Sequence, residues 1–251
     1  MHRSWRSVLL LSALLLAILP PAPVRAEGDA LVLASGAGYK QMVNALVKAY
    51  GAETGKTVDL VYGNMAQVTG QVRAGGVVDL VVGAEFFLSD PALGLAEPVE
   101  LGRGRLVLAW PKGRSAMMTD RGTVDLNAES VRRIALPDPV KAIYGKAAME
   151  YLKSSGQYEA VQAKLTPVAT VPQVFAYLVA DEVDLGFMNL THVLGVKDQL
   201  GGWKEMPLDG YEPIRINAYP LRNAPHAAAL ADFLRFLGTD AAREIVRANG
   251  L

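Results

Sequence analysis

The chain has 251 residues, of which 51% are hydrophobic and 20% are charged, with 25 basic side chains balancing 25 acidic ones and no cysteine. This balance argues against nucleic acid or an anionic membrane as the main partner, since both attract strongly basic proteins. Without cysteine there is no disulfide framework and no lipid-bearing thiol, so an ordinary hydrophobic core must hold the fold, and this length can supply one.

The first 26 residues have the pattern of a secretory signal peptide. Arg3 and Arg6 give a basic start, an apolar run covers residues 8–19, and Ala26 ends a Val-x-Ala cleavage site. The run is shorter than the roughly 20 residues that a membrane-spanning helix needs. We therefore expect cleavage after Ala26 and a free periplasmic protein. Its formal charge would be −3, because the leader contains three of the 25 basic residues and no acidic one.

After the leader, apolar runs of strand length alternate with segments of helical period, which is the pattern of a mostly parallel sheet covered by helices. The strands that this pattern predicts lie at 30–33, 58–62, 79–84, 105–110, 133–136, 165–169, 183–188 and 214–219. The predicted helices cover 39–52, 65–74, 143–155, 172–180, 227–237 and 239–248. Residues 86–103 read as a loop.

The alternation of predicted strands and helices restarts after Trp110, and extended segments near Trp110 and Tyr219 could join two α/β units. We therefore expect a first lobe of residues 27–107 with 218–251, and a second lobe of residues 108–217. The final helices would return to the first lobe. A single larger sheet is the alternative, because periodicity alone does not prove that return.

Motifs of cofactor or metal chemistry are weak. Gly36-Ala37-Gly38 begins like a dinucleotide fingerprint, but Gln41 stands where the third glycine belongs. Once the leader is removed only two histidines remain, and they form no metal-binding pair. We expect His226 to be a solvated residue at a helix start and His192 to be structural or exposed. The sequence therefore predicts no cofactor, no metal, no catalytic residue and no enzyme.

Polar turns of small residues recur after the predicted strands, at 34–39, 63–67, 137–144, 169–173 and 186–191. Ligands of open α/β sheets bind at the carboxyl ends of the strands, where helix N-termini direct free N–H groups. In the first turn, Gly36 and Gly38 would let the backbone approach a ligand closely. The alternative is a glycine turn needed only for tight packing of strand against helix.

Five stretches give the chain a resemblance to the periplasmic molybdate-binding proteins, the solute receptors of molybdate ABC importers within the type II periplasmic binding proteins. They are 31-LVLASGAGYKQMVNAL-46, 66-AQVTGQVRAGGVVDLVVGAE-85, 105-RLVLAWPKG-113, 136-LPDPVKAIYGKAAMEYL-152 and 174-VFAYLVADEVDLGFMN-189. The resemblance implies a two-lobed α/β fold with two crossover strands, a ligand cleft between the lobes, closure on binding, and delivery to a membrane permease.

The resemblance also implies a set of ligand positions. The family holds a tetrahedral oxyanion with serine hydroxyls of the first two turns, a tyrosine hydroxyl of the fifth, and backbone N–H groups of the third and fourth. Here these hydroxyl positions carry Ala37, Met65 and Asn189, while Val171 keeps the family type and a shortened third turn brings Lys141 close. The expected ligand-binding residues are Ser35, Gly36, Ala37, Gly38, Tyr39, Asn64, Met65, Lys141, Val171 and Asn189.

The functional hypothesis is a monomeric, extracytoplasmic receptor of an ABC importer that binds a small anion, with molybdate or tungstate as the leading candidate. Asn64 and Asn189 offer acceptors as well as donors, so an oxyanion with its own protons or a small organic acid stays open. A sensory module that reports to a membrane kinase or chemoreceptor is the alternative in another class. An enzyme is disfavoured because the predicted cleft has no obvious nucleophile or base.

Overall fold

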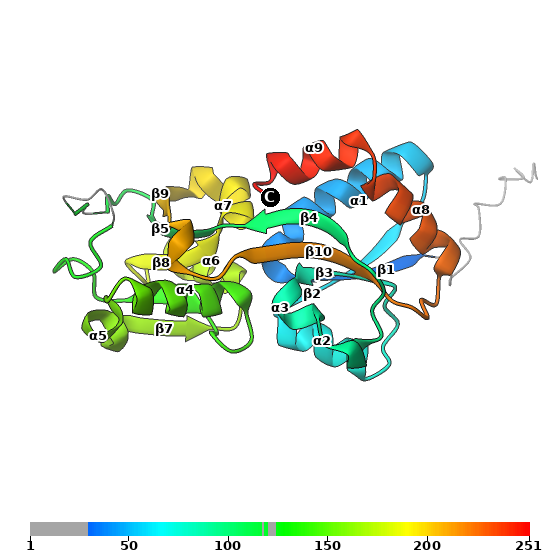
Figure 1. Ribbon diagram of the computed structural model, residues 1–251. Helices are drawn as coiled ribbons and strands as arrows, with labels where there is room; N and C mark the ends of the chain where they lie inside the picture. Colours follow the sequence, from blue (N-terminus) through cyan, green and yellow to red (C-terminus); the bar gives the residue numbers. More distant parts are fainter. Residues whose placement is uncertain (1–29, 117, 120–123) are drawn as a thin grey trace, which may run out of the picture.

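The computed structural model describes residues 30–116, 118–119 and 124–251, so the predicted signal peptide lies outside the described residues. The described part contains two five-stranded sheets flanked by helices, side by side in an elongated molecule (Figure 1). The strands of the first sheet are β1 (Leu31–Gly36), β2 (Val58–Gly63), β3 (Leu80–Ala84), β4 (Val99–Gly104) and β10 (Ile214–Pro220). Those of the second are β5 (Leu106–Pro111), β6 (Ile134–Pro137), β7 (Leu165–Val168), β8 (Leu185–Asn189) and β9 (Leu200–Glu205).

Both sheets are built to the same plan. The strand orders are β2-β1-β3-β10-β4 and β7-β6-β8-β5-β9. In each, three neighbouring strands run parallel, so that their carboxyl ends share one edge. Two further strands complete each sheet in antiparallel pairing. The chain crosses from the first sheet to the second between β4 and β5, and it returns between β9 and β10 (Figure 1). We call each sheet with its helices a lobe.

The first lobe carries five α-helices in the described residues: α1 (Lys40–Thr54), α2 (Met65–Arg73), α3 (Glu85–Leu88), α8 (Ala227–Leu237) and α9 (Asp240–Ala248). The second carries α4 (Ile143–Ser154), α5 (Tyr158–Val161), α6 (Val171–Val179) and α7 (Leu190–Val196). Of the two C-terminal helices, α9 packs against α1 of the first lobe, and Phe233 and Phe236 of α8 contact Tyr50 of α1 (Figure 1). None of the described helices is both long and apolar enough to cross a bilayer.

Local sequence signals explain where these helices begin and end. Met42, Val43 and Leu46 form the buried stripe of α1, and the helix stops at Gly55, whose φ of 71° favours glycine. Asn64 caps α2 in a reciprocal capping box with Gln67.

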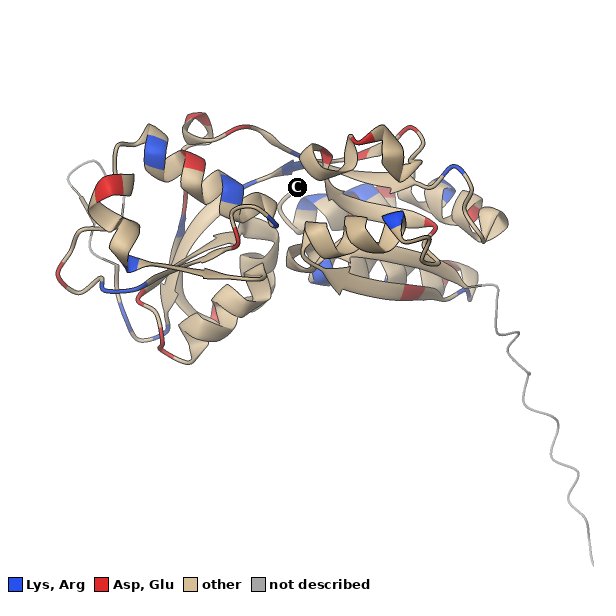
Figure 2. Cartoon of the chain, turned by 90° about the horizontal axis from the view of Figure 1, so that it is seen from below, with Lys and Arg blue, Asp and Glu red and all other residues tan. Residues whose placement is uncertain are grey.

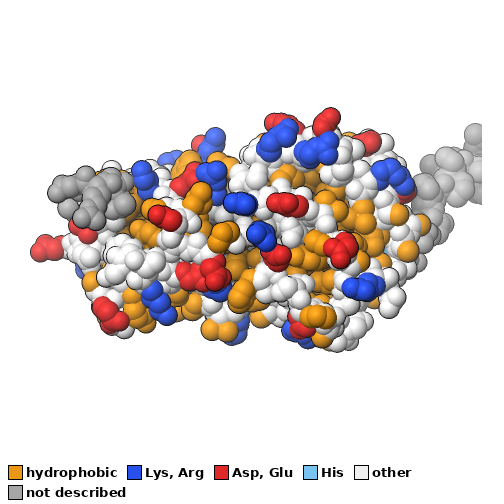
Figure 3. Space-filling view, viewed as in Figure 1, with side chains coloured by type: hydrophobic (Ala, Val, Ile, Leu, Met, Phe, Trp, Pro, Cys, Tyr) orange, Lys and Arg blue, Asp and Glu red, His pale blue; other side chains and the backbone are white. Residues whose placement is uncertain are grey.

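One continuous cluster of buried apolar side chains runs through both lobes, from Leu33 and Met42 in the first to Leu106 and Phe187 in the second. The lobes therefore pack against each other. On the face shown in Figure 3, acidic and basic side chains are interspersed with apolar ones. Figure 2, seen from below, likewise shows both signs of charge on both lobes.

The two-lobed α/β architecture confirms the predicted fold class. The predicted loop over 86–103 is wrong in part, because α3 and β4 overlap with it. The predicted elements also leave out β9, α5 and α7. β5 begins at Leu106 in the second sheet and β10 begins at Ile214 in the first, so the predicted lobe boundaries fall inside these two strands.

The prediction that His226 is solvated is wrong. Its backbone nitrogen and its ring Nδ1 each lie 2.8 Å from a carboxylate oxygen of Asp79, which is fully buried immediately before β3. This contact ties the beginning of α8 to the first sheet. His192 is buried in α7 and packs edge-on against Phe175, which agrees with a structural role.

Candidate functional site

Turns after four strands, two from each lobe, line a common cavity that we call the inner pocket. Its void is about 340 Å³ including the mouth. The lining residues are Gly36, Ala37, Gly38, Tyr39, Gly63, Asn64, Met65, Ala142, Ile143, Tyr144, Thr170 and Val171. They follow β1 and β2 in the first lobe and β6 and β7 in the second, at the carboxyl edges of the two sheets. No charged side chain is among the described residues that line it.

Helix N-termini from both lobes meet at this pocket. Helices α2, α4 and α6 each begin there, and α1 follows the short 3₁₀ turn Ala37–Tyr39. The first N–H groups of a helix have no partner within it, and they form the positive end of the helix dipole. At α4 the capping residue is Ala142, whose side chain has no hydrogen-bonding group. The pocket is therefore rich in backbone donors without any cationic side chain.

Asn64 is held so that only its amino group is uncommitted. Its side-chain oxygen accepts a hydrogen bond of 2.9 Å from the Gln67 N–H, and its own N–H donates to the Gln67 side chain over 2.9 Å. These bonds fix which end of the amide is oxygen. Toward a ligand, Asn64 therefore offers a donor, rather than the acceptor that the sequence left open.

Tyr39 and Tyr144 are joined by a hydrogen bond between their hydroxyl oxygens, 2.8 Å apart. Tyr39 comes from the first lobe and Tyr144 from the start of α4 in the second, so this bond passes from lobe to lobe. Burial raises the pKa of Tyr39 well above its ordinary value, and Tyr144 beside it raises this pKa further. Burial likewise raises the pKa of Tyr144. Both hydroxyls therefore keep their protons at neutral pH.

Asn189 lies behind the first turn. Its amino group donates to the carbonyl of Gly38 over 3.0 Å, which is a second bond between the lobes. A Cβ on Gly38 would lie 3.0 Å from the Asn189 side-chain oxygen, a tight contact that would require Asn189 to shift by a few tenths of an ångström. Asn189 is fully buried and is not one of the residues that line the pocket. It supports the turn rather than facing the void.

The structure brings seven of the ten predicted residues to the inner pocket, namely Gly36, Ala37, Gly38, Tyr39, Asn64, Met65 and Val171. Asn189 contacts their turn from behind. Ser35 is fully buried and its hydroxyl donates to the Gly36 carbonyl over 3.3 Å, so it belongs to the strand end. The Lys141 side chain is 57% exposed and pairs with Asp138 at 3.4 Å, away from the lining.

Sequence reasoning missed Tyr144 and Thr170, although both lie in or next to turns that it singled out. Thr170 caps α6 through a bond of 3.4 Å from the Gln173 N–H, and Pro172 follows two residues later in the first helical turn. A threonine cap with proline in the first turn is a recognisable helix start. Tyr144 ends the stretch 137-PDPVKAIY-144, but nothing local shows that its hydroxyl reaches the other lobe.

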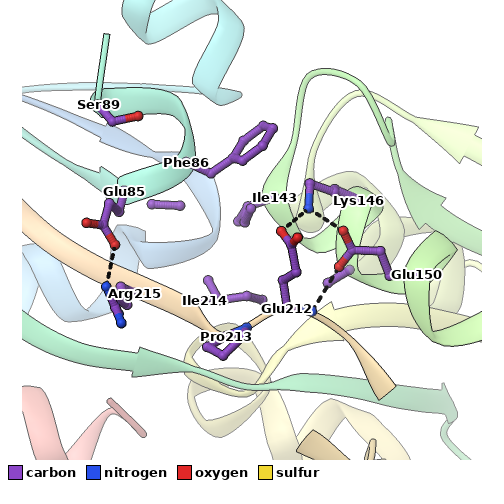
Figure 4. A pocket seen from close by; sticks show the side chains of 12 residues that line it. Glu85, Phe86, Ser89, Ile143, Lys146, Glu150, Glu212, Pro213, Ile214 and Arg215 are labelled. Carbon is purple, nitrogen blue, oxygen red and sulfur yellow. Dashed lines mark hydrogen bonds and ion pairs between the residues drawn. The ribbon is translucent and has the colours of Figure 1, made fainter. Parts of the chain in front are cut away.

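A second and larger cavity, the outer chamber, adjoins the inner pocket. Its void is about 740 Å³ including the open space at its mouth. The chamber lies between α3, α4 and residues 212–215, and Ile143 lines both cavities. Lys146 contacts Glu150 and, at 2.6 Å, Glu212 (Figure 4). Burial acts to lower the pKa of Lys146, but its bonds to the two carboxylates raise that pKa above the ordinary value. The Lys146 amino group also lies 4.7 Å from the centre of the Phe86 ring.

A family model described as "Bacterial extracellular solute-binding protein" matches residues 31–251. The chain belongs to this family. It is 28% identical over 240 residues to the molybdate-binding protein ModA of Rhodobacter capsulatus, covering 94% of this chain and 93% of that protein. It is 33% identical over 152 residues to ModA of Azotobacter vinelandii, covering 59% and 58%.

Among solved structures, the periplasmic molybdate-binding protein of Azotobacter vinelandii superposes with a TM-score of 0.79 over 88% of this chain and 97% of that one. At 22% identity this likeness shows the fold. The resemblance to periplasmic molybdate-binding proteins is thus confirmed over nearly the whole described chain. These relatives are named as binding proteins and not as enzymes, in agreement with the prediction.

Proposed function

We propose that this solute-binding protein is the extracytoplasmic receptor of an ABC importer and binds a small, fully deprotonated oxyanion in the inner pocket, with molybdate or tungstate as the leading candidate. The observation that carries the proposal is the meeting of helix N-termini from both lobes at a pocket without a charged lining side chain. Such ends bind anions through free N–H groups and the helix dipole. The names of the relatives point to the same ligand class.

The loss of three family hydroxyls does not leave the pocket without donors. Each hydrogen bond to a charged group contributes roughly 1.5–3 kcal/mol, so three losses would matter if nothing replaced them. The Asn64 amino group, the Thr170 hydroxyl and the one hydroxyl proton that the Tyr39–Tyr144 bond does not use can replace them. These are neutral donors, as a desolvated dianion requires.

A deprotonated ligand fits better than one that carries protons. No carboxylate is among the described residues that line the inner pocket, and the Asn64 oxygen is committed to Gln67. Among the side chains that line the pocket, the uncommitted oxygens are hydroxyls, whose own protons compete with a ligand O–H. Molybdate, tungstate and sulfate carry no proton at neutral pH, whereas phosphate and arsenate do.

The outer chamber favours a second candidate, a larger organic anion. A bare tetrahedral ion needs only the inner pocket, yet the outer chamber with its Lys146 and Phe86 lies beside that pocket and shares Ile143 with it. An oxyanion ester or a small carboxylic acid could place its anionic group on the helix N-termini and its organic part beside Phe86. This candidate keeps the binding role and changes only the cargo.

A thermal-shift and calorimetric screen of residues 27–251 tests both candidates. The panel is molybdate, tungstate, sulfate, phosphate, arsenate, small carboxylates and organophosphonates, each at neutral pH. A ligand at a hundred times its dissociation constant stabilises the native state by about 2.7 kcal/mol. We expect a shift with molybdate and tungstate and none with phosphate or arsenate. Shifts with carboxylates or organophosphonates alone would replace the first candidate by the second.

Transport and sensing require a separate test. Cells that lack this gene should lose uptake of the identified ligand at low external concentration if the protein serves an importer, and co-purification with the permease should follow. Normal uptake with a lost ligand-dependent response would favour the sensory role.

A further inference from the structure

Two tyrosines reach the inner pocket from opposite lobes. Tyr39 closes the turn after β1, and Tyr144 stands in the first turn of α4. Both side chains are almost fully buried, both residues line the pocket, and their hydroxyl oxygens are 2.8 Å apart. Their ring centroids are 6.2 Å apart and the planes are inclined by 53°, so the rings meet at their hydroxyl ends without stacking face to face.

The hydrogen count of this pair leaves one proton over. Each phenol hydroxyl has one proton to donate and lone pairs to accept with. The bond between Tyr39 and Tyr144 uses one of the two protons. The other proton has two acceptors within its surroundings. One is the buried Asn189 side chain, which the Tyr144 hydroxyl contacts and whose oxygen has no other partner among the described residues. The other is an oxyanion in the pocket, whose negative charge makes it the stronger acceptor.

A glycine in the crossover strand makes this arrangement possible. Gly104 is the last residue of β4, immediately before the chain passes into the second lobe. A Cβ at this position would lie 2.1 Å from the Tyr144 hydroxyl oxygen, which is an impossible contact. The position of the Tyr144 hydroxyl therefore depends on a glycine in the segment that connects the lobes.

We infer that Tyr39 and Tyr144 form a composite hydroxyl donor that is assembled across the two lobes and binds the oxyanion, in place of the tyrosine hydroxyl that the family supplies from the position of Asn189. The inference rests on the proposed function, whose pocket and ligand class it adopts. Because each lobe contributes one hydroxyl, the donor is complete only when the lobes are together. Gly104 is its positioning residue.

Phenylalanine variants test the donor with little change in packing. We expect Tyr39→Phe and Tyr144→Phe each to weaken molybdate binding by about ten- to one-hundredfold, the loss that follows from removing one hydrogen bond to a charged group. The double variant should lose less than the product of the two single losses, because the hydroxyls act through one shared bond. Affinity is measured by calorimetry, and urea unfolding verifies that each variant is folded.

The chain offers a matched control in Tyr50, which is fully buried in the first lobe between Phe233 and Phe236. Its hydroxyl has no hydrogen-bond partner among the described residues. Tyr50→Phe should therefore bind molybdate as the parent does. Gly104→Ala should weaken binding about as much as Tyr144→Phe, and it should add little further loss when introduced together with Tyr144→Phe.

The possible outcomes separate this inference from the proposed function. If the parent binds molybdate and both phenylalanine variants bind it within twofold of the parent, the hydroxyls are not donors and the inference fails, while the proposed function stands. An equal loss in Tyr50→Phe would also overturn it, since the effect would then be general. If the parent binds no oxyanion of the panel, the proposed function fails and the donor assignment fails with it.

Discussion

At the scale of single residues, His192 shows how burial couples stability to pH. The side chain is 7% exposed, and neither ring nitrogen has a hydrogen-bond partner within the described part of the chain. Burial lowers the pKa of His192 from 6.5 to about 4, because the charged ring cannot be solvated there. The folded protein therefore holds the neutral ring, whereas the unfolded chain takes up a proton below about pH 6.5.

This difference predicts a loss of stability in acid. The contribution of His192 is complete above pH 6.5 and declines as the pH falls toward 4, by at most about 1.36 kcal/mol per pH unit and about 3 kcal/mol in all. His192→Leu removes the titrating group and keeps an apolar side chain against Phe175. We expect its urea midpoint to fall less than that of the parent between pH 7 and pH 4.5. Parallel pH profiles for the two proteins would contradict the assignment.

At the scale of elements, the sequence predicted those segments whose signal is local. Helix α4 follows from the apolar spacing of Ala147, Ala148 and Leu152, and the observed bounds differ from the predicted ones by a single residue. Strand β4 has the sequence VELGRG and is partly exposed at the edge of its sheet. It is held extended by antiparallel pairing with β10, which lies more than a hundred residues later in the chain. A partner so distant leaves no signal in the strand's own sequence.

The candidate site likewise has features that local sequence predicts and features that depend on distant parts of the chain. Turns after parallel strands were predictable because the carboxyl ends of such strands meet at one edge. Contacts between the lobes were not predictable, because they depend on how two separate sheets pack. Asn189 was expected to face the ligand and instead holds the carbonyl of Gly38, while the reach of Tyr144 to Tyr39 was not foreseen.

Gly145, in the first turn of helix α4, packs closely against the turn that precedes the helix. A Cβ there would lie 2.1 Å from the Pro137 carbonyl oxygen and 2.6 Å from that of Asp138, both backbone atoms of the turn that leads into the helix. Gly145→Ala should therefore destabilise the protein by about 1–3 kcal/mol through overpacking. It should also weaken ligand binding, because it shifts the helix end that carries Tyr144.

Gly70, inside α2, is the matched control. Apart from its chain neighbours and the backbone of its own helix, a Cβ at this position would meet no atom of the described structure within 4 Å. Gly70→Ala should therefore raise stability by up to about 1 kcal/mol, the difference in helix propensity between the two residues. Urea unfolding midpoints measure both effects. Equal shifts for the two variants, in sign and size, would show that the close contact at Gly145 has no role.

At the scale of the whole molecule, three contacts hold the lobes together around the two cavities. They are the bond between Tyr39 and Tyr144, the bond from Asn189 to Gly38, and the approach of the Lys146 amino group to the Phe86 ring. The first two lie at the inner pocket, and the third spans the outer chamber (Figure 4). A ligand that binds only when the lobes are together gains affinity from every contact that favours this arrangement.

The contact of Phe86 with Lys146 is the one that can be removed without touching the inner pocket. Phe86 is 56% exposed on α3 of the first lobe, so its ring contributes little to that lobe's core. A cation lying over an exposed aromatic ring contributes about 0.5–1 kcal/mol. Phe86→Leu keeps an apolar side chain and removes the ring. We expect it to weaken binding of the identified ligand about two- to fivefold, chiefly through faster dissociation, with association and unfolding little changed.

Tyr158→Leu is the control, since it removes a ring that Lys153 approaches within the second lobe alone, at 5.7 Å from its centre. Stopped-flow kinetics measure the dissociation rate of both variants. If Phe86→Leu releases the ligand at the parent's rate, the contact across the chamber does not hold the lobes together. The same conclusion follows if Tyr158→Leu releases the ligand as fast as Phe86→Leu does.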